Sequence, residues 1–581
     1  MKVYKLLLPY LKQYRGHYIA GAIALIVASG SQLIIPQFIR AAIDIISYGN
    51  FALSDLIPAI TGLMIAAFAI VVSRLGWRFF IHGASRRIEG SLRSRLFAHW
   101  LKLSPGYFNS MTTGDLMARA TNDLNAVRMA SGMALVAAVD GLFMTIAIVA
   151  ILFIQSPTLA AYTIIPFPLI TVFILTLGTV VGKLFRGVQD SFAEVSSQAQ
   201  EVLSGVAIIQ AYAKENYFNS RFGAANLEYQ HRNMKLARVW GLFMPVISFL
   251  SGITTLLLLR FGGEQVILYQ ITPGTFVATL GYLQLLIWPM MGAGWTVNLL
   301  QRGAASLSRI QEVLSVHPEI TQPLQPYPIH AISSIEIRNL TFRYSDDSPA
   351  ILHDISMHIP PGSTIGILGR TGSGKSTLVQ LLCRMYNAPV GSIFINAVDI
   401  LQADLHNLRA NIGVVGQNSF LFSATMRENI GFGLSEPDQQ LVQHSANLAT
   451  ISRDIQGFPL QWETPVGERG ITLSGGQKQR TTIARALAVN PSLLILDDAL
   501  SAVDTETEEQ ILNHLFEERR GKNNIIISHR VSTLSHADFI YVLDHGRIIQ
   551  QGTHFSLSTS PGLYRDIVHM QQLDSQHEER T

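Results

Sequence analysis

The chain has 581 residues, which is too long for one ordinary hydrophobic core and predicts several domains. Only 14% of the residues are charged and the mean hydropathy is +0.29, a composition that is typical of membrane proteins and not of soluble domains. The net charge of +3 and the lack of a basic tract interleaved with aromatics argue against a nucleic-acid partner. The single cysteine, Cys383, cannot form an internal disulfide and is interpreted as a core residue in a reducing compartment.

Six apolar stretches in the first half are each long enough to cross a hydrocarbon core of about 30 Å as a helix. They lie at 18–46, 56–77, 133–155, 158–182, 243–268 and 274–297. The basic and aromatic segment before them, residues 1–16, is interpreted as interfacial. The sequence therefore predicts a transmembrane domain over residues 1–317, with a helix over 301–317 that leaves the membrane.

Charge differs sharply between the links. The two long loops carry many basic residues, whereas the links at 47–55, 156–157 and 269–273 contain no Lys or Arg. The basic residues are Arg86, Arg87, Arg93, Arg95, Lys102, Arg119 and Arg128 in one loop, and Lys183, Arg186, Lys214, Arg221, Arg232, Lys235 and Arg238 in the other. The positive-inside rule places both long loops and both termini in the cytoplasm.

Each long loop has about fifty residues and a pattern that predicts helical extensions of the spans. The stretch 108–116 has the turn and capping residues of a short transverse helix followed by a new long one, and 212–218 shows a comparable break. Either stretch could be a mere helix connection. The functional alternative is a contact that transmits motion to the second domain.

Ionisable groups inside spans are functional candidates by default. Asp140 lies in the third span, and Arg74 and Arg78 lie one turn apart at the end of the second. Structural pairing or a place near the interface is the favoured interpretation of all three. Five residues of the sixth span could line an adaptable apolar cavity or could simply pack: Trp288, Pro289, Met290, Met291 and Trp295.

Residues 318–333, with four prolines, predict an extended linker, and a soluble α/β domain is expected over 334–581. Within it, an apolar run at 364–368 is followed by a stretch that fits the phosphate-binding pattern G-x-x-x-x-G-K-[ST]. The stretch consists of Gly369, Arg370, Thr371, Gly372, Ser373, Gly374, Lys375, Ser376 and Thr377. Backbone N–H groups and the start of a helix near Ser376 would bind polyphosphate, with Lys375 as a mobile cation and the Ser376 hydroxyl on Mg²⁺.

Three further features of this domain point the same way. The apolar strand 493–496 ends in Asp497, the arrangement of a carboxylate that holds Mg²⁺ beside Ser376. Tyr344, ahead of the loop, is well placed to stack on a base. A second Gly-rich helix start follows the loop by about a hundred residues, comprising Ser474, Gly475, Gly476 and Gln477. If one domain cannot bring both anion sites to one ligand, two domains can sandwich ATP between them.

These motifs and their order make the chain resemble a half-transporter of the ATP-binding cassette (ABC) exporter family along nearly its whole length. The resemblance implies six transmembrane helices with long cytoplasmic extensions, followed by an α/β P-loop nucleotide-binding domain. It implies that Tyr344 stacks on adenine, Gln417 is the Q-loop glutamine and a magnesium ligand, Ser474–Gln477 is the signature, and His529 is the switch histidine. It also identifies Asp497 as the Walker B aspartate, Ser501–Asp504 as the D-loop, and Thr464–Glu468 as a segment that touches a partner's cytoplasmic loops.

One position departs from the family pattern. Competent sites carry Glu after the Walker B aspartate, whereas this chain has Asp498. A carboxylate shortened by one methylene can still accept a proton, but it retracts from the attacking water, and misplacement of about 1 Å can cost about 10²-fold in rate. This resembles the degenerate half of heterodimeric exporters. The alternative is a tolerated substitution in a homodimer.

The sequence thus predicts ATP-driven export of a small or amphipathic substrate across the cytoplasmic membrane. The expected catalytic residues are Asp498, His529 and Gln417, and the expected partners are membrane lipids and a second half-transporter that carries Glu after Walker B. A homodimeric exporter or lipid flippase is the first alternative, and an ATP-gated channel or regulator is the second. The substrate is not readable from the sequence, because the cavity lining depends on helix rotation.

Overall fold

The computed structural model describes residues 5–47, 49, 52–436 and 438–578. These residues form two compact units. One contains the residues up to Leu101 together with Thr113–Val316, and the other contains Lys102–Thr112 together with the residues from His317 on. Parts of two expected features lie outside the described residues, namely positions 1–4 of the interfacial segment and positions 48, 50 and 51 of the first link.

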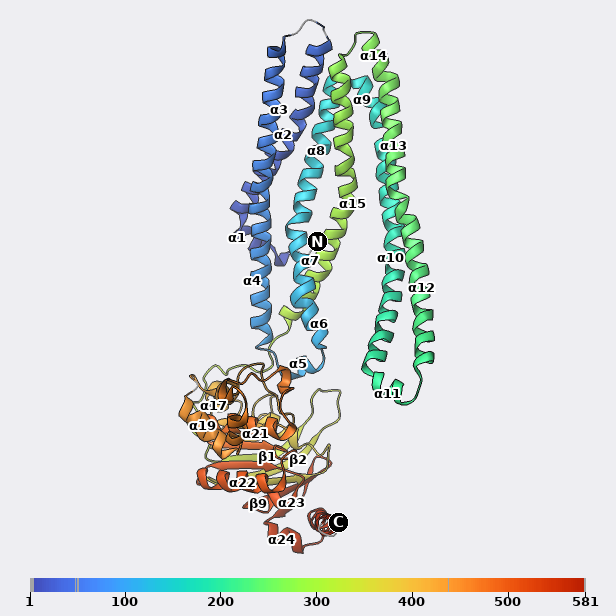
Figure 1. Cartoon of the computed structure of the whole chain (residues 1–581). Helices are drawn as coiled ribbons and strands as arrows, with labels where there is room; N and C mark the ends of the chain where they lie inside the picture. Colours follow the sequence, from blue (N-terminus) through green and yellow to red (C-terminus); the bar gives the residue numbers. More distant parts are fainter. Residues whose placement is uncertain (1–4, 48, 50–51, 437, 579–581) are drawn as a thin grey trace. The chain divides into compact units, whose positions relative to one another are not determined.

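In the described residues of the first unit, all regular secondary structure is helical (Figure 1). Six long helices have the length and apolar composition needed to cross a membrane, which confirms the six expected spans. In chain order the elements are α1 (Leu8–Gln13), α2 (Arg15–Ser47), α3 (Leu53–Trp77), η2 (Arg78–His82), α4 (Gly83–Trp100), α6 (Thr113–Ala118), η3 (Arg119–Asp123), α7 (Leu124–Ser131), α8 (Met133–Gln155), α9 (Pro157–Ile164), α10 (Pro166–Ser204), α11 (Val206–Ala211), α12 (Glu215–Gly241), α13 (Phe243–Leu257), η4 (Leu258–Gly262), α14 (Gly263–Ile267) and α15 (Pro273–Ser315).

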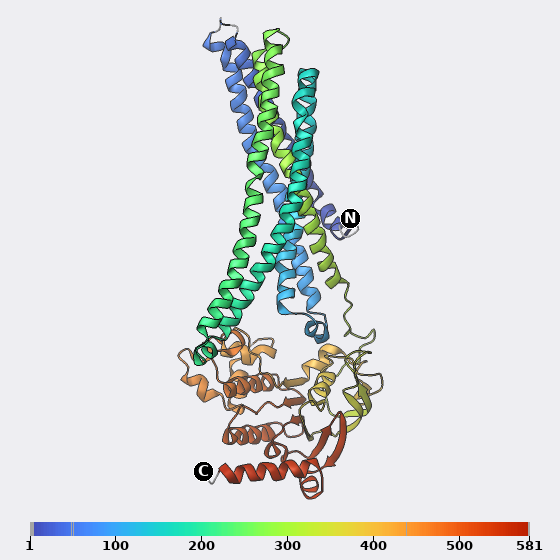
Figure 2. The same cartoon turned by 90° about the vertical axis from the view of Figure 1, so that its right-hand side faces the viewer.

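The predicted helical extensions are confirmed. Helix α3 continues through η2 into α4, and α10 continues unbroken to Ser204. Figures 1 and 2 both show α10 and α12 side by side, with α11 joining their ends. Helix α15 also runs without a break into the expected exit helix, so the sixth span and that helix are one element.

Polar contacts fasten α2 to the beginning of α15. The Asp44 carboxylate accepts hydrogen bonds from the Gly274 amide at 2.8 Å and from the Thr272 hydroxyl at 2.9 Å. A Cβ atom at Gly274 would lie 2.3 Å from the Arg40 carbonyl oxygen, so the close approach of the two helices requires glycine there. Further along, the fully buried Tyr282 hydroxyl donates to the Leu33 carbonyl at 2.8 Å. These bonds satisfy polar groups that lipid cannot satisfy.

The three ionisable span residues have separate partners among the residues that the structure describes. Asp140 is hydrogen-bonded to the buried Ser29 hydroxyl, Arg74 reaches Gln32 at 3.4 Å, and the Arg78 guanidinium lies 5.7 Å from the centre of the Trp77 ring. The alternative that these residues pair with one another is therefore not what the structure shows, because their partners are hydroxyl, amide and aromatic groups of other residues. None of these three contacts joins Asp140, Arg74 and Arg78 to one another.

The second unit contains two sheets. The larger has the order β10-β9-β3-β8-β7-β6, and all its neighbouring pairs are parallel except the edge hairpin of β9 and β10. Its strands are β3 (Thr364–Gly369), β6 (Ile412–Val415), β7 (Leu493–Asp497), β8 (Asn523–Ile527), β9 (Phe539–Asp544) and β10 (Arg547–Gly552). The smaller antiparallel sheet has the order β2-β1-β4-β5, with β1 (Ile335–Phe342), β2 (Leu352–Ile359), β4 (Ile393–Ile395) and β5 (Val398–Asp399).

Helices cover the larger sheet. Strands β3, β7 and β8 are buried along their whole length, as expected for parallel strands with both faces covered. The helical elements of this unit are α5 (Pro105–Asn109), α16 (Lys375–Leu382), α17 (Leu405–Ala410), α18 (Met426–Ile430), η5 (Gly431–Gly433), α19 (Gln439–Leu448), α20 (Ser452–Gly457), η6 (Gln461–Glu463), η7 (Glu468–Gly470), α21 (Gly475–Ala488), α22 (Thr505–Glu518), α23 (Val531–Leu534), α24 (His554–Thr559) and α25 (Leu563–Glu578).

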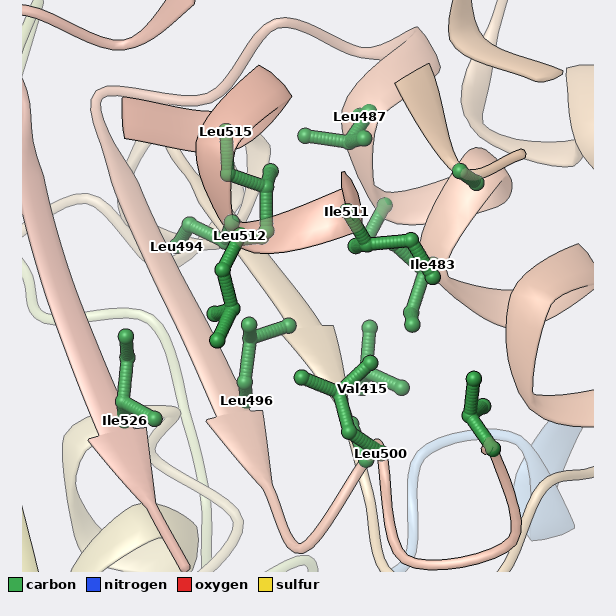
Figure 3. Close-up of a cluster of buried hydrophobic side chains, with 14 of the residues drawn as sticks. Val415, Ile483, Leu487, Leu494, Leu496, Leu500, Ile511, Leu512, Leu515 and Ile526 are labelled. Carbon is green, nitrogen blue, oxygen red and sulfur yellow. The ribbon is translucent and has the colours of Figure 1, made fainter. Parts of the chain in front are cut away.

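One core cluster lies between the sheet and helices α21 and α22 (Figure 3). Aliphatic side chains from β6, β7 and β8 meet those of the two helices there: Val415, Ile483, Leu487, Leu494, Leu496, Leu500, Ile511, Leu512, Leu515 and Ile526. The expected linker 318–333 forms no helix, and Ile329 and Ile332 are buried in a second cluster with β1 and β3. This packing fixes the carboxyl ends of β3 and β7, from which the candidate site is built.

Candidate functional site

The loop after β3 has the local geometry of a phosphate-binding turn. Gly372 and Gly374 have φ values of +82° and +97°, in the left-handed region that favours glycine. A Cβ atom at Gly374 would also lie 2.6 Å from Leu352 Cδ2, so a larger residue would have to displace that buried side chain. Helix α16 begins at Lys375, within one residue of the predicted start, and its first N–H groups face the loop.

A cavity of about 390 Å³ opens at this loop. It brings together residues that lie far apart in the sequence, and most of them are the predicted ones. Its lining consists of Tyr344, Ile351, Gly369, Thr371, Gly372, Ser373, Gly374, Lys375, Ser376, Thr377, Gln417, Asp497, Asp498, Ile527, Ser528 and His529. Arg370 belongs to the loop but does not line the cavity, and its carbonyl accepts from Lys375 instead.

Sequence reasoning missed three lining residues: Ile351, Ile527 at the end of β8, and Ser528. Ser528 directly precedes His529 and follows the apolar strand β8, so a polar residue at the end of a buried strand was an available signal. Ile351 lies just before β2 and carries no local signal. It reaches the cavity because the smaller sheet folds over the loop, as the closeness of Leu352 to Gly374 shows.

Lys375 is folded back onto its own loop. Its ammonium group donates to the Gly369 carbonyl at 2.7 Å, to the Arg370 carbonyl at 2.9 Å and to the Ser373 hydroxyl at 3.3 Å. Burial lowers the pKa of Lys375, and the charges of Asp497 and Asp498 oppose that shift. The ammonium thus lies at the centre of the loop, where it can neutralise an anionic ligand.

The Asp497 carboxylate ends strand β7 and is only 5% exposed. Burial raises the pKa of Asp497, and the neighbouring Asp498 charge adds to the rise. The pKa is lowered by the hydrogen bond between this carboxylate and the Ser376 hydroxyl and by the charge of Lys375. A hydroxyl and a carboxylate are hard oxygen ligands that suit Mg²⁺, which is commonly held by one or two protein groups together with phosphates and water. Across the described residues, no group of three or more His, Cys, Asp or Glu side chains forms an alternative metal cage.

Asp498 and His529 form a pair at the mouth of the cavity. The Asp498 Oδ1 atom lies 2.8 Å from His529 Nδ1, and the two side chains are 20% and 60% exposed. Asp498 has φ +52°, an αL conformation that aspartate adopts more readily than longer residues. Its amide donates to the Ile527 carbonyl at 2.9 Å and its carbonyl accepts from the Ser501 hydroxyl at 3.0 Å, so the backbone here is fixed on both sides.

Tyr344 is 43% exposed at the other end of the cavity. Its hydroxyl lies 2.9 Å from Thr377 Oγ1 and donates to Gln380 Oε1 at 3.1 Å, which ties the side chain to α16. Gln417 also lines the cavity and is exposed. The predicted aromatic, loop, carboxylate and histidine residues therefore meet in one place.

The residues Ser474–Gln477 are not part of this cavity lining. The Ser474 hydroxyl caps α21 by accepting a hydrogen bond from the Gln477 backbone amide at 3.2 Å. The Ser474 backbone amide in turn donates to Gln477 Oε1 at 3.1 Å. Gly476 packs so closely that a Cβ atom would lie 2.9 Å from the Ala502 carbonyl oxygen. Within one chain this second helix start and the first loop are separate sites, as the sequence suggested they could be.

Comparison with known proteins agrees with this geometry. Residues 18–290 match the ABC transporter transmembrane region, and residues 352–501 match the ABC transporter family that carries the nucleotide-binding motifs. The chain belongs to the ABC transporter family. It is 37% identical to the probable multidrug resistance ABC transporter ATP-binding/permease protein YheI of Bacillus subtilis, with 97% of each chain covered.

Two further comparisons place this ABC transporter among exporters. It is 32% identical to the ATP-dependent lipid A-core flippase of Syntrophus aciditrophicus, with 98% of this chain and 95% of that protein covered. Its fold matches the structure of a bacterial Atm1-family ABC exporter with ATP bound, with a TM-score of 0.78, 26% identity, and coverage of 96% and 98%. The chain is therefore a membrane protein that binds ATP and couples its hydrolysis to transport.

Proposed function

We propose that this chain is one half of a heterodimeric exporter whose own ATP site hydrolyses slowly. The observation that supports this proposal is Asp498, which stands where the family pattern has Glu and pairs with His529 at 2.8 Å. A site with a complete phosphate loop and a shortened carboxylate binds ATP well and cleaves it poorly. The partner would be a second half-transporter that carries Glu at the corresponding position.

The cavity supports a definite arrangement of the nucleotide. Adenine would stack on the exposed ring of Tyr344, and the phosphates would lie on the loop amides, with Lys375 turning from the loop carbonyls toward them. Ser376, Gln417 and Asp497 would hold Mg²⁺ through side-chain oxygens. When bound, the ion would neutralise charge on the phosphate oxygens.

Asp498 and His529 would act on the attacking water and the transferred phosphoryl group. Asp498 would accept the proton of the water, and His529 would hold the Asp498 carboxylate at Nδ1 while its exposed Nε2 edge faces the ligand. Phosphoryl transfer depends mostly on positioning and charge stabilisation, so a carboxylate about 1 Å too far back lowers the rate more than the affinity.

The intact signature would serve the partner's site. Ser474–Gln477 and the neighbouring Ala502 form a rigid unit, because Gln479 donates to the Ser501 hydroxyl at 2.9 Å and accepts from the Ala502 amide at 2.8 Å. A second chain that placed its own phosphate loop against this helix start would gain N–H donors for its nucleotide. Two ATP molecules would then be sandwiched between the two chains.

Closure of such a sandwich would drive the transmembrane helices from an inward-open to an outward-open arrangement, and hydrolysis would reset them. One relative is named a probable multidrug resistance transporter and another a lipid A-core flippase. Both names favour a small or amphipathic substrate for this chain. The charge pattern of the loops supports a cytoplasmic nucleotide-binding domain. The spans would lie among lipids in the cytoplasmic membrane.

The test is Mg-ATP hydrolysis by the chain purified alone in lipid, beside the variants Asp498→Asn and His529→Ala. We expect retained ATP binding with negligible turnover, because the site lacks the longer carboxylate. Robust turnover that Asp498→Asn abolishes would show that Asp498 suffices, and would replace the heterodimer with a homodimeric exporter or flippase. Nucleotide-dependent leak without uphill flux in vesicles would instead favour the ATP-gated channel.

A further inference from the structure

A chain of side-chain contacts joins the short helix α5 to the base end of the cavity. Helix α5 and the nucleotide-binding residues belong to the same compact unit. The Asn109 amide at the end of α5 donates to the Tyr386 hydroxyl at 3.3 Å. The Tyr386 ring lies 4.9 Å from the Tyr344 ring at 74°, and Tyr344 lines the cavity. Three side chains thus span the distance from α5 to the nucleotide site.

Tyr386 is held rigidly between these two neighbours. It is only 8% exposed, and a Cβ atom at Gly106 would lie 3.4 Å from Tyr386 Cε1, so the backbone of α5 rests on the ring. The Ser104 hydroxyl, at the start of α5, donates to the Glu319 carboxylate at 2.9 Å. Asn387 in turn donates to the Glu319 carbonyl at 2.8 Å, which anchors α5 a second time beside Tyr386.

The other end of the chain of contacts is equally fixed. The Tyr344 hydroxyl is tied to Thr377 and Gln380 on α16, and its ring meets Phe342 at 5.3 Å and 82°. Because its hydroxyl and one side of its ring are in contact with neighbours, a change in the Tyr344 ring orientation alters its contact with Tyr386. Among the described residues, the polar contacts of Lys375 and the close neighbour of Gly374 lie within the phosphate loop and β2 and not in α5, since Lys375 donates to Gly369 and Ser373 and Gly374 lies against Leu352.

We infer that Tyr386 is a positioning residue that links α5 to the adenine base rather than to the phosphates of the bound nucleotide. The inference rests on the proposed stacking of adenine on Tyr344. A base on Tyr344 restricts the Tyr344 and Tyr386 rings and thereby holds α5, and by linkage a well-docked α5 favours the base. A ligand that carries phosphates without a base fills the loop and leaves α5 as it was.

The test compares Mg-ATP with magnesium tripolyphosphate, which has the phosphates but no base, on the full chain in lipid nanodiscs. Hydrogen exchange of the 105–111 segment reports α5 directly, since the Tyr107 and Ser110 amides are bonded within it to Ser104 and Gly106. Saturating ATP is expected to slow this exchange about threefold, the size of one aromatic contact. Tripolyphosphate is expected to leave it unchanged.

Four variants sharpen the comparison. Tyr386→Leu is expected to remove the protection and to weaken ATP binding about threefold to tenfold, with tripolyphosphate affinity unchanged. Asn109→Ala and Tyr386→Phe each remove the same hydrogen bond, so each should reduce the protection and the double variant should reduce it no further. Ser110→Ala is the matched control, because the Ser110 hydroxyl donates to the Tyr107 carbonyl within α5.

Two results would overturn the inference: protection of α5 by tripolyphosphate equal to that by ATP, or protection that persists in the Asn109→Ala and Tyr386→Phe variants. Tyr386→Phe keeps the buried ring, and Asn109→Ala changes an exposed residue, so both variants remain informative even where Tyr386→Leu does not fold. Tyr344→Ala separates the inference from the proposed function. If it leaves ATP affinity unchanged, adenine does not stack there, and the proposed nucleotide arrangement and the inference both fail. If it weakens ATP binding while α5 stays unresponsive, only the inference fails.

Discussion

Replacing Asp498 with glutamate is the sharpest perturbation of this site. The Asp498→Glu substitution restores one methylene to a carboxylate that reaches His529 Nδ1 at 2.8 Å but is set back toward the backbone. A gain of about 1 Å of reach corresponds to about 10²-fold in rate, or about 2.7 kcal/mol in activation free energy. We therefore expect turnover at this site to rise by up to about 100-fold, with ATP affinity unchanged.

The same substitution has a predictable cost. Residue 498 has φ +52°, and aspartate tolerates this conformation better than glutamate, so the Glu variant is expected to lose about 1 kcal/mol of stability. Its backbone is held by bonds to Ile527 and Ser501, which keep the αL conformation in place. The rate should therefore rise although the domain unfolds at a slightly lower temperature.

The assay is steady-state phosphate release by the purified chain in lipid, with ATP affinity measured separately. Asp498→Asn, which keeps the size and removes the charge, is the matched control and should show no turnover. Unchanged turnover in Asp498→Glu, together with substantial Asp498-dependent turnover in the parent chain, would refute the argument that carboxylate reach limits this site.

Three further predictions concern Asp497, the two glycines of the phosphate loop, and Cys383. The variant Asp497→Asn should raise the unfolding midpoint of the nucleotide-free chain at neutral pH and remove the stabilisation by Mg-ATP. Burial holds the folded-state pKa of Asp497 above its unfolded value, so stability is lost as the pH rises from the unfolded pKa through the folded pKa. Differential scanning fluorimetry against pH checks this. Gly374→Ala should abolish ATP binding, whereas Gly372→Ala, with no atom within 4 Å of the new Cβ, should cost only about 1 kcal/mol of backbone strain, as equilibrium binding and thermal unfolding would show. Cys383, whose pKa burial raises to about 12, should resist maleimide in the native chain at pH near neutral and react fully in denaturant, and rapid native labelling would contradict its buried place.

Much of the fold was predictable because its signals are local. Apolar runs of span length, loop charges and the Gly-rich turn each depend on neighbouring residues, and the helical extensions, the break at α5 and the start of α16 followed from them. The positions of Tyr344, Asp497 and His529 in one cavity came from the resemblance and from strand ends, since parallel strands place their carboxyl ends at one edge.

The features that sequence reasoning missed are long-range contacts. Nothing near Ile351 marks it as a lining residue, because the fold of the smaller sheet over the loop brings it there. Tyr386 reads as an ordinary core aromatic in the sequence, and its contact with Asn109 joins residues 277 positions apart. The buried anchoring of the 318–333 stretch by Ile329 and Ile332 was likewise invisible in its proline-rich composition.

The most direct test of the account is the composition of the native transporter. The complex would be purified from its own membranes through a tag on this chain, its mass would be measured by native mass spectrometry, and its ATP turnover would be measured beside that of the Asp498→Asn variant. The account predicts one copy of this chain with one copy of a different ABC half that carries Glu after its Walker B strand, and turnover that Asp498→Asn barely changes. Two copies of this chain with turnover that Asp498→Asn abolishes would contradict it.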